Sequence, residues 1–473
     1  MSGTNGHGKY KELLINIGIF SLASLLSKAI MFFLLPLYTN VLSPAEYGTV
    51  ELIMTGINLL TPIFTLSISD AVVRFGLDSR IDHGHVLKAE TVFLVGSSLV
   101  MIACYPLLHL YRPLEGYTWI FIFAMIVLMF RSNYTFYLKS INNNKLFAID
   151  SIIYTLVLAG SNILFLVGLK MGIAGYMLSL IVASLISIVF VLLVGHGLRD
   201  LRISPFDKKL LKDMVAYSAP MVFNALSWWI TNSSDKYMLE YFWSSSEVGI
   251  YSAAAKIPAL ITTVNALFSQ AWTLSSVKEY EHSKDKSFFK NIFSMYSFVM
   301  FLATAAILLI VKPFMNIYVG SDFNTSWYYV PALLIASLYG CFSNYFGSIY
   351  IAAKQNIKCT LSTIICGIVN IVLNFALIPK YGIWGATIAT AISFIIVGVY
   401  RMVDCQRLFY FPIDYWKYGV ASVLVVADSI LIIHSRFRYL ISSFVILIII
   451  IVYKNEVSAV LRTIRNSIQR RKD

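Results

Sequence analysis

The chain has 473 residues, of which 58% are hydrophobic and 13% charged, and its mean hydropathy is +0.74. This composition excludes an ordinary soluble globular protein and indicates a chain that crosses a membrane many times. The formal net charge of +13 does not indicate nucleic-acid binding, because most of the 37 Lys and Arg residues fall in loops on one side of the predicted membrane.

The first half contains six apolar segments of membrane-spanning length. The first of them is too long for the core of a signal peptide, so we interpret it as a retained span. Short loops separate the segments and leave no room for a soluble catalytic domain. The predicted spans lie at about 13–38, 47–69, 91–110, 117–138, 148–169 and 172–195.

A basic segment at 198–211 separates the two halves. After Pro205 it alternates apolar and charged residues, which predicts an amphipathic helix on the cytoplasmic surface. Eight further spans are predicted at about 212–232, 248–275, 291–312, 327–352, 357–379, 381–403, 416–434 and 437–453. The predicted parts are therefore a six-helix lobe at 1–197, a linker at 198–211, a second six-helix lobe at 212–403, and a two-helix hairpin with a basic tail at 404–473.

Two glycine motifs recur in the two halves. Glu46-Tyr47-Gly48 has a counterpart in Glu247-Val248-Gly249, 201 positions later, and the sequence around Gly172 at the sixth span resembles that around Gly382 at the twelfth. Six spans is an even number, so both halves have the same orientation, as in a parallel repeat around a central cavity. The predicted fold class is an all-α integral membrane protein of two six-helix lobes and two C-terminal helices, with about 14 transmembrane helices.

The distribution of positive charge predicts the orientation in the membrane. Loops on the side of both termini carry most of the Lys and Arg, so we expect both termini to be cytoplasmic. The basic tail then faces anionic lipid headgroups.

Two lysines lie inside predicted spans, where a charge is costly and often functional. Lys28 is about 22 Å along its helix from the predicted cytoplasmic end, and Lys256 about 12 Å in from the outer end of its span. We interpret both as cavity residues that bind a diphosphate group, because ammonium groups in a low-dielectric cavity pair well with anionic oxygens. The alternatives are a packing role for Lys28 and an interface anchor for Lys256.

Two further pairs are candidates for gating or coupling. Asp70 and Arg74 have i,i+4 spacing, which also fits a local salt bridge on one helix face. Asp235 and Lys236 are adjacent near the end of the seventh span.

Amide and aromatic residues of the seventh and tenth spans are candidates for contacts with a glycan at the outer ends of these spans. Aromatic rings and amides suit sugars, but the same residue types also mark membrane interfaces in general. The candidates are Asn224, Trp228, Asn232, Asn344 and Tyr345.

The sequence contains neither a phosphate-binding loop of the Gly-x-x-x-x-Gly-Lys-Ser/Thr type nor a metal-ligand pattern. We therefore expect no cofactor, no metal and no catalytic residues. A membrane glycan polymerase is the enzyme alternative, although its expected large extracytoplasmic loop or acidic site is absent from the sequence. A cation-coupled multidrug extruder is the other alternative, which a cavity with carboxylates as its main buried charges would favour, whereas the two lysines favour an anionic cargo.

Several motifs together resemble those of bacterial polysaccharide flippases, a family of the superfamily that also contains multidrug extruders and lipid II flippases. The resemblance covers about residues 10–450 and rests on the order of four motifs, although Asp235-Lys236 stands where the family usually has Asp-Arg. These motifs are Pro36-Leu37-Tyr38-Thr39-Asn40-Val41-Leu42-Ser43-Pro44-Ala45-Glu46-Tyr47-Gly48, Ser234-Asp235-Lys236, Glu247-Val248-Gly249-Ile250-Tyr251-Ser252-Ala253-Ala254-Ala255-Lys256-Ile257 and Tyr381-Gly382-Ile383-Trp384-Gly385-Ala386.

The resemblance implies that the protein moves a polyprenyl-diphosphate-linked oligosaccharide from the cytoplasmic to the outer leaflet by alternating access, for O-antigen, capsule or another surface polymer. It also implies a cationic cavity to which the first and eighth spans contribute basic residues, as Lys28 and Lys256 do here. The expected location is the bacterial inner or plasma membrane. The expected partners are membrane lipids, a glycan polymerase and a chain-length regulator, and no nucleic acid.

Overall fold

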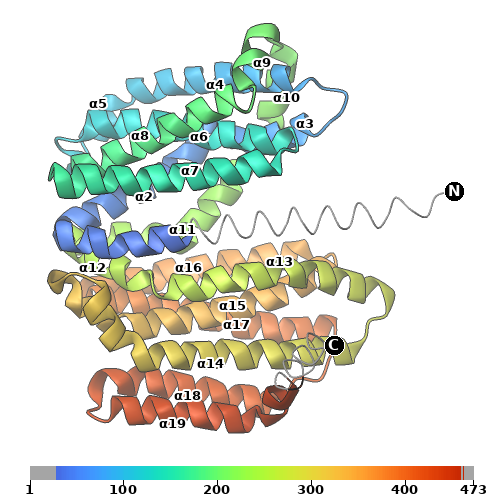
Figure 1. Ribbon diagram of the computed structural model, residues 1–473. Coiled ribbons are helices and arrows are strands. Elements are labelled where there is room, and N and C mark those ends of the chain that lie inside the picture. The colour runs from blue at the N-terminus through green and yellow to red at the C-terminus, as the bar shows by residue number, and fades with distance from the viewer. Residues whose placement is uncertain (1–27, 460–461, 463–473) are drawn as a thin grey trace, which may run out of the picture. The chain divides into compact units, whose positions relative to one another are not determined.

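The computed structural model describes residues 28–459 and residue 462, and every regular element in this part of the chain is a helix. The predicted all-helical membrane fold is confirmed (Figure 1). The chain forms two compact units. The N-terminal unit reaches as far as Tyr237 and includes Ser244–Gly249, and the C-terminal unit consists of Met238–Trp243 and the chain from Ile250 onwards.

The described part of the N-terminal unit begins with an apolar helical segment, Lys28–Val41. Most of the predicted first span, 13–38, lies outside the described residues. A turn of 3-10 helix, Arg112–Leu114, precedes α6 (Thr118–Ser140), and a π-helical turn, Ile163–Gly168, extends α7 (Asn144–Asn162). The other helices of this unit are α2 (Pro44–Thr65), α3 (Ile68–Gly76), α4 (His83–Ala103), α5 (Tyr105–His109), α6 (Thr118–Ser140), α7 (Asn144–Asn162), α8 (Gly172–Leu193), α9 (Gly197–Ile203) and α10 (Lys208–Ser218).

Helices α11 (Met221–Phe242) and α12 (Ser245–Ala255) begin in the N-terminal unit and end in the C-terminal unit. A 3-10 segment, Ser321–Tyr328, lies between α14 and α15. The remaining helices are α13 (Pro258–His282), α14 (Lys286–Tyr318), α15 (Val330–Ala352), α16 (Asn356–Tyr381), α17 (Ile383–Leu408), α18 (Tyr415–His434) and α19 (Arg438–Val452).

Local sequence explains where α2 starts and stops. The hydroxyl of Ser43 accepts a hydrogen bond from the backbone N–H of Glu46, whose carboxylate accepts one from the backbone of Ser43, and Pro44 supplies a fixed φ at the first position. The helix ends at Leu66 and Ser67, both in the left-handed conformation, before α3 resumes. The predicted second span is therefore two helices with a break between them.

Ten helices of the described chain are long and apolar enough to cross a membrane, or eleven if the bent pair α12 and α13 is one span. The 22-residue α11 is not among them, and Lys28–Val41 and α19 are shorter apolar helices. The predicted number of 14 spans is thus not confirmed. Hydropathy alone does not identify α11 as a membrane span, because its amide, hydroxyl and charged residues lower the mean hydropathy of the helix.

The linker helix belongs to the packed N-terminal unit. Leu210 and Met214 of α10 are buried in a cluster with apolar residues of α3, α4, α6 and α8. The predicted boundary at 211 falls inside α10, and the compact units divide later, within α11 and α12. The predicted lobe boundaries stay a prediction. They mark the ends of sequence repeats, whereas the compact units are defined by contacts between residues.

Candidate functional site

The two copies of the Glu-x-Gly motif meet inside the N-terminal unit. A Cβ atom added to Gly48 would lie 1.7 Å from the carbonyl oxygen of Ser245, and one added to Gly249 would lie 2.0 Å from that of Pro44. Pro44 and Ser245 are themselves 201 positions apart, so the contact is reciprocal. Only glycine permits this approach of α2 and α12.

A half-buried ion pair lies within one turn of Gly48 along α2. The ammonium of Lys236 in α11 lies 2.7 Å from one carboxylate oxygen of Glu51, and the hydroxyl of Tyr47 donates to the other oxygen at 2.9 Å. Trp229 and Tyr237 donate from α11 to backbone carbonyls of α2. Lys236, predicted as a gating candidate, is thus one member of the polar contact between α2 and α11.

Its neighbour Asp235 is buried. One oxygen of its carboxylate accepts a hydrogen bond from the backbone N–H of Lys236 at 2.9 Å. A gating or coupling role for the two residues stays a prediction.

One face of α11 carries exposed polar residues. Asn224, Trp228 and Asn232 are spaced by four positions, and all three are exposed in the described structure. The amide of Asn232 donates to the carbonyl of Trp228 at 2.7 Å. Amide groups facing hydrocarbon lack the hydrogen bonds that water supplies, so such a face is favourable only along a wet path. Their role as glycan contacts stays a prediction.

The two predicted diphosphate ligands lie in different units. Lys28 is exposed and is the first described residue of the helical segment Lys28–Val41. Lys256 lies half-buried in the turn between α12 and α13, where the two helix axes bend by 46°. Pro258 produces this break, because it cannot donate a backbone hydrogen bond. Broken spans of this kind mark substrate sites in many transporters, which supports the choice of Lys256.

Asp70 and Arg74 do not form the local salt bridge that their spacing allows. Both side chains are exposed on α3, and no hydrogen bond or ion pair joins them in the described part of the chain. Their role in gating stays a prediction.

Three of the predicted glycan contacts do not lie at the outer ends of their helices under the predicted orientation. Asn224 is three residues from the start of α11, and Asn344 and Tyr345 lie in the last third of α15. These are the ends predicted to be cytoplasmic. Tyr345 is also fully buried, and its hydroxyl donates to the carbonyl of Phe289 while its ring stacks on Trp272.

Sequence reasoning missed an isolated buried carboxyl group. Glu90 in α4 has no exposed surface, and neither of its carboxyl oxygens has a hydrogen-bond partner among the described residues. The predicted third span began at residue 91, so Glu90 was placed in a loop. The helix in fact begins at His83, which puts Glu90 about 10 Å along it.

A second buried carboxylate, that of Asp150, has a hydrogen-bond partner for each of its oxygens. Asp150 accepts hydrogen bonds from Ser187 at 2.6 Å and Thr135 at 3.2 Å, and Arg131 lies 3.9 Å away. The guanidinium of Arg131 also lies over the ring of Tyr154. Asp150 does not cap a helix, because α7 begins six residues earlier, and its contacts join α6, α7 and α8.

The C-terminal unit contains a buried arginine. Arg401 in α17 donates to the hydroxyls of Ser362 and Thr363 and to the carbonyls of Ser343 and Cys359, at 2.7 to 3.2 Å. No carboxylate pairs with it among the residues that the structure describes. Neutral oxygens on α15 and α16 therefore hold this charge and tie the three helices together.

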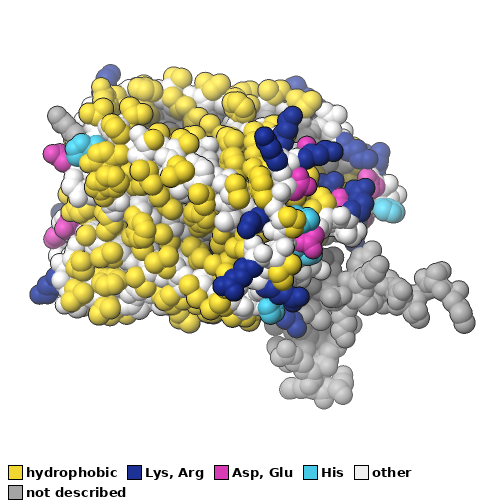
Figure 2. All heavy atoms as spheres, turned by 90° about the horizontal axis from the view of Figure 1, so that it is seen from above, with side chains coloured by type: hydrophobic (Ala, Val, Ile, Leu, Met, Phe, Trp, Pro, Cys, Tyr) yellow, Lys and Arg dark blue, Asp and Glu magenta, His cyan; other side chains and the backbone are white. Residues whose placement is uncertain are grey.

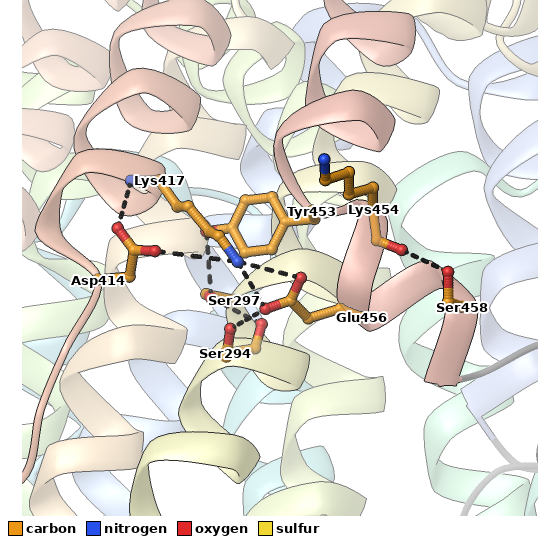
Figure 3. Close-up of polar contacts among 8 residues, drawn as sticks. All are labelled: Ser294, Ser297, Asp414, Lys417, Tyr453, Lys454, Glu456 and Ser458. Atoms are coloured by element: carbon orange, nitrogen blue, oxygen red, sulfur yellow. Dashed lines mark hydrogen bonds and ion pairs between the residues drawn. The ribbon is translucent and has the colours of Figure 1, made fainter.

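A polar cluster fastens the C-terminal hairpin to α14 (Figure 3). Lys417 at the start of α18 lies 3.1 Å from the carboxylate of Glu456, which follows α19, and 3.8 Å from that of Asp414. Ser294 of α14 donates to the same Glu456 oxygen at 2.5 Å. Burial alone would raise the pKa of Glu456, but the hydrogen bond from Ser294 and the ammonium of Lys417 outweigh it, so this pKa lies below its usual value.

Comparisons with known proteins agree with this architecture. Residues 13–273 match the family described as polysaccharide biosynthesis protein. A probable low-salt glycan biosynthesis flippase, Agl15 of Haloferax volcanii, is 26% identical over 196 residues. That match covers 39% of this chain and 40% of the relative, so the aligned part spans about two fifths of the relative's length.

Solved structures with the same fold include transporters of two kinds. The lipid II flippase MurJ in an inward closed conformation gives a TM-score of 0.69 over 94% of this chain and 99% of that chain, at 14% identity. An inward-facing multidrug resistance MATE family transporter gives a TM-score of 0.65 over 83% of this chain and 94% of that chain, also at 14% identity. The chain therefore shares the fold of these transporters, and because the family match covers more than half of the sequence, the chain belongs to the polysaccharide biosynthesis protein family.

Proposed function

We propose that this protein moves a polyprenyl-diphosphate-linked oligosaccharide from the cytoplasmic to the outer leaflet of a bacterial inner or plasma membrane, for surface polysaccharide assembly. Both termini are cytoplasmic in this proposal. Membership of the family supports a role in polysaccharide assembly, and the flippase relatives support transport of a lipid-linked glycan. A glycan polymerase and a chain-length regulator are the proposed partners.

The observation that carries the proposal is the exposed polar face of α11. Asn224, Trp228 and Asn232 present amides and an aromatic ring along a helix of spanning length. A glycan offers hydroxyl groups for the amides and C–H faces for the ring, so it suits this face better than an apolar cargo does. The lipid tail stays in the bilayer while the headgroup follows the wet path.

The diphosphate is assigned to Lys28 and Lys256. Charge-assisted hydrogen bonds from ammonium groups to phosphate oxygens are about twice as strong as neutral ones, so two lysines from two repeats form a suitable pair. Lys256 at the helix break is the better supported of the two.

A cation-coupled multidrug extruder is the second candidate function. The similarity to a MATE family transporter favours it, because the two folds agree over most of both chains. The two candidates differ in the charge of the cargo, which is anionic for the flippase and generally cationic for an extruder.

Equilibrium binding to the purified protein in nanodiscs tests the proposal. We expect the diphosphate-linked oligosaccharide to bind more tightly than the same glycan on an uncharged lipid, and the difference to shrink in Lys28→Ala and Lys256→Ala. Lys354→Ala is the matched control, because this lysine is exposed and pairs with Glu281. Equal affinity for the charged and uncharged lipids in the native protein would remove the diphosphate site.

A further inference from the structure

A groove with a basic rim and an apolar floor lies between α10 and α4. Its volume is about 650 Å³, and its lining consists of Phe93 of α4 and Lys208, Lys209, Leu211, Lys212 and Val215 of α10. None of the three ammonium groups forms a hydrogen bond or ion pair with a residue that the structure describes. Of the two neighbouring carboxylates, Asp207 caps α10 and Asp213 is exposed.

The packing of α10 fixes the position of this basic rim. Leu210 and Met214 are buried in the core of the N-terminal unit, so the opposite side of the helix presents its lysines outwards. The segment before α10 is held as well, because Lys88 of α4 donates to the carbonyl of Leu201 at 2.9 Å and Tyr137 of α6 donates to Asp200. These contacts hold α10 and the segment before it against α4 and α6.

The floor of the groove continues into the lipid-facing side of α4. Phe93 is ten residues after the start of α4, about 15 Å along the helix. Val92, Val95 and Leu99 are exposed apolar residues on the same helix. In the predicted orientation, the groove thus extends from the level of lipid headgroups to that of acyl chains.

The surrounding surface is also basic. A second groove of about 350 Å³, lined by Arg199, Arg202 and apolar residues that include Ile203, lies at the end of α8. In Figure 2, Lys and Arg side chains gather at the end of the visible face where Figure 1 places α9 and α10, and hydrophobic side chains cover most of the rest.

We propose that the groove between α10 and α4 binds an anionic phospholipid of the leaflet on the linker side. The phosphate lies against the ammonium groups of Lys208, Lys209 and Lys212, and one acyl chain lies along Phe93 and the apolar side chains of α10. Charge complementarity selects an anionic headgroup, and the apolar floor selects a lipid over a free phosphate. This proposal does not depend on the proposed function.

Native mass spectrometry of the full-length protein with phosphatidylglycerol, phosphatidylcholine and a polyprenyl diphosphate tests the site. We expect tighter binding of phosphatidylglycerol than of phosphatidylcholine. Each Lys→Gln change should weaken phosphatidylglycerol binding about fivefold, so that K208Q/K209Q/K212Q weakens it on the order of a hundredfold. The corresponding triple Lys→Arg variant keeps the charge and should bind like the native protein.

The matched control is K284Q/K286Q/K290Q, which removes three exposed lysines of the C-terminal unit from the same predicted membrane side. It should leave phosphatidylglycerol binding within about twofold of native. Phe93→Ala should weaken binding of the phospholipid and leave that of glycerol phosphate unchanged. Equal losses in the two triple Gln variants, equal binding of both phospholipids, or a loss confined to the polyprenyl diphosphate would each overturn the proposal.

Discussion

Glu90 is a residue whose replacement should stabilise the protein. A buried carboxyl group without hydrogen-bond partners costs about 1 to 3 kcal/mol. Glu90→Leu keeps a similar volume and removes this cost, so we expect the free energy of unfolding to rise by about 1 to 2 kcal/mol. Thermal unfolding in detergent measures the change.

Asp150→Leu is the control for Glu90, because the carboxylate of Asp150 accepts hydrogen bonds from Ser187 and Thr135. This variant leaves two buried hydroxyls without an acceptor and Arg131 without its ion pair, and should lower the melting temperature. Equal destabilisation in the two variants would show that Glu90 has a stabilising partner.

Single charged residues were only partly predictable from the sequence. Lys28 and Lys256 stand out because apolar residues surround them on both sides. Glu90 does not, because two His and one Lys precede it in the first two turns of α4 and lower the local hydropathy. No sequence pattern showed that Glu90 would be left without partners, since burial of its side chain depends on helices that pack around α4 and lie elsewhere in the sequence.

At the level of helices, the contact between α2 and α12 should be sensitive to a single methyl group. Gly48→Ala places a Cβ atom 1.7 Å from the carbonyl oxygen of Ser245, so the two helices must separate. We expect a loss of about 1 to 3 kcal/mol in stability. Gly249→Ala should have a similar effect, because the contact is reciprocal.

Gly96→Ala is the matched control for these variants. Its added Cβ atom would meet no other atom within 4 Å, and Ala favours a helix over Gly by about 1 kcal/mol. Gly96→Ala should therefore raise the melting temperature while Gly48→Ala lowers it. Similar shifts in both variants would mean that α2 and α12 do not meet as described.

The sequence predicted that these glycines recur, but not that the two copies meet each other.

The attachment of the C-terminal hairpin should depend on pH. The pKa of Glu456 is lowered in the folded protein, so its interactions stabilise the hairpin above the usual value of 4.5 and are lost as pH falls through the lower folded pKa. Hydrogen exchange in α19 should accordingly accelerate in acid. Glu456→Gln should lose this acid dependence and exchange faster than native at neutral pH. A pH profile shared by the two proteins would contradict the role of Glu456.

At the scale of the whole molecule, hydropathy and repeated motifs predicted the membrane class, the helical fold and the family resemblance. They did not predict how the chain divides into compact units. The linker packs on the N-terminal unit through Leu210 and Met214, and α11 contributes Lys236 to the polar contact with α2. These contacts form between residues far apart in the sequence, and no local pattern reports them.

The central claim is that the protein translocates a lipid-linked oligosaccharide, and transport between leaflets of reconstituted liposomes tests it most directly. We predict protein-dependent movement of a polyprenyl-diphosphate oligosaccharide, with a loss of at least tenfold in the Lys28→Ala, Lys256→Ala double variant at equal abundance. Lys354→Ala should transport at the native rate. If the lipid stayed in its leaflet while an ion gradient drove export of a small cationic dye, the account would be wrong and the protein would be an extruder.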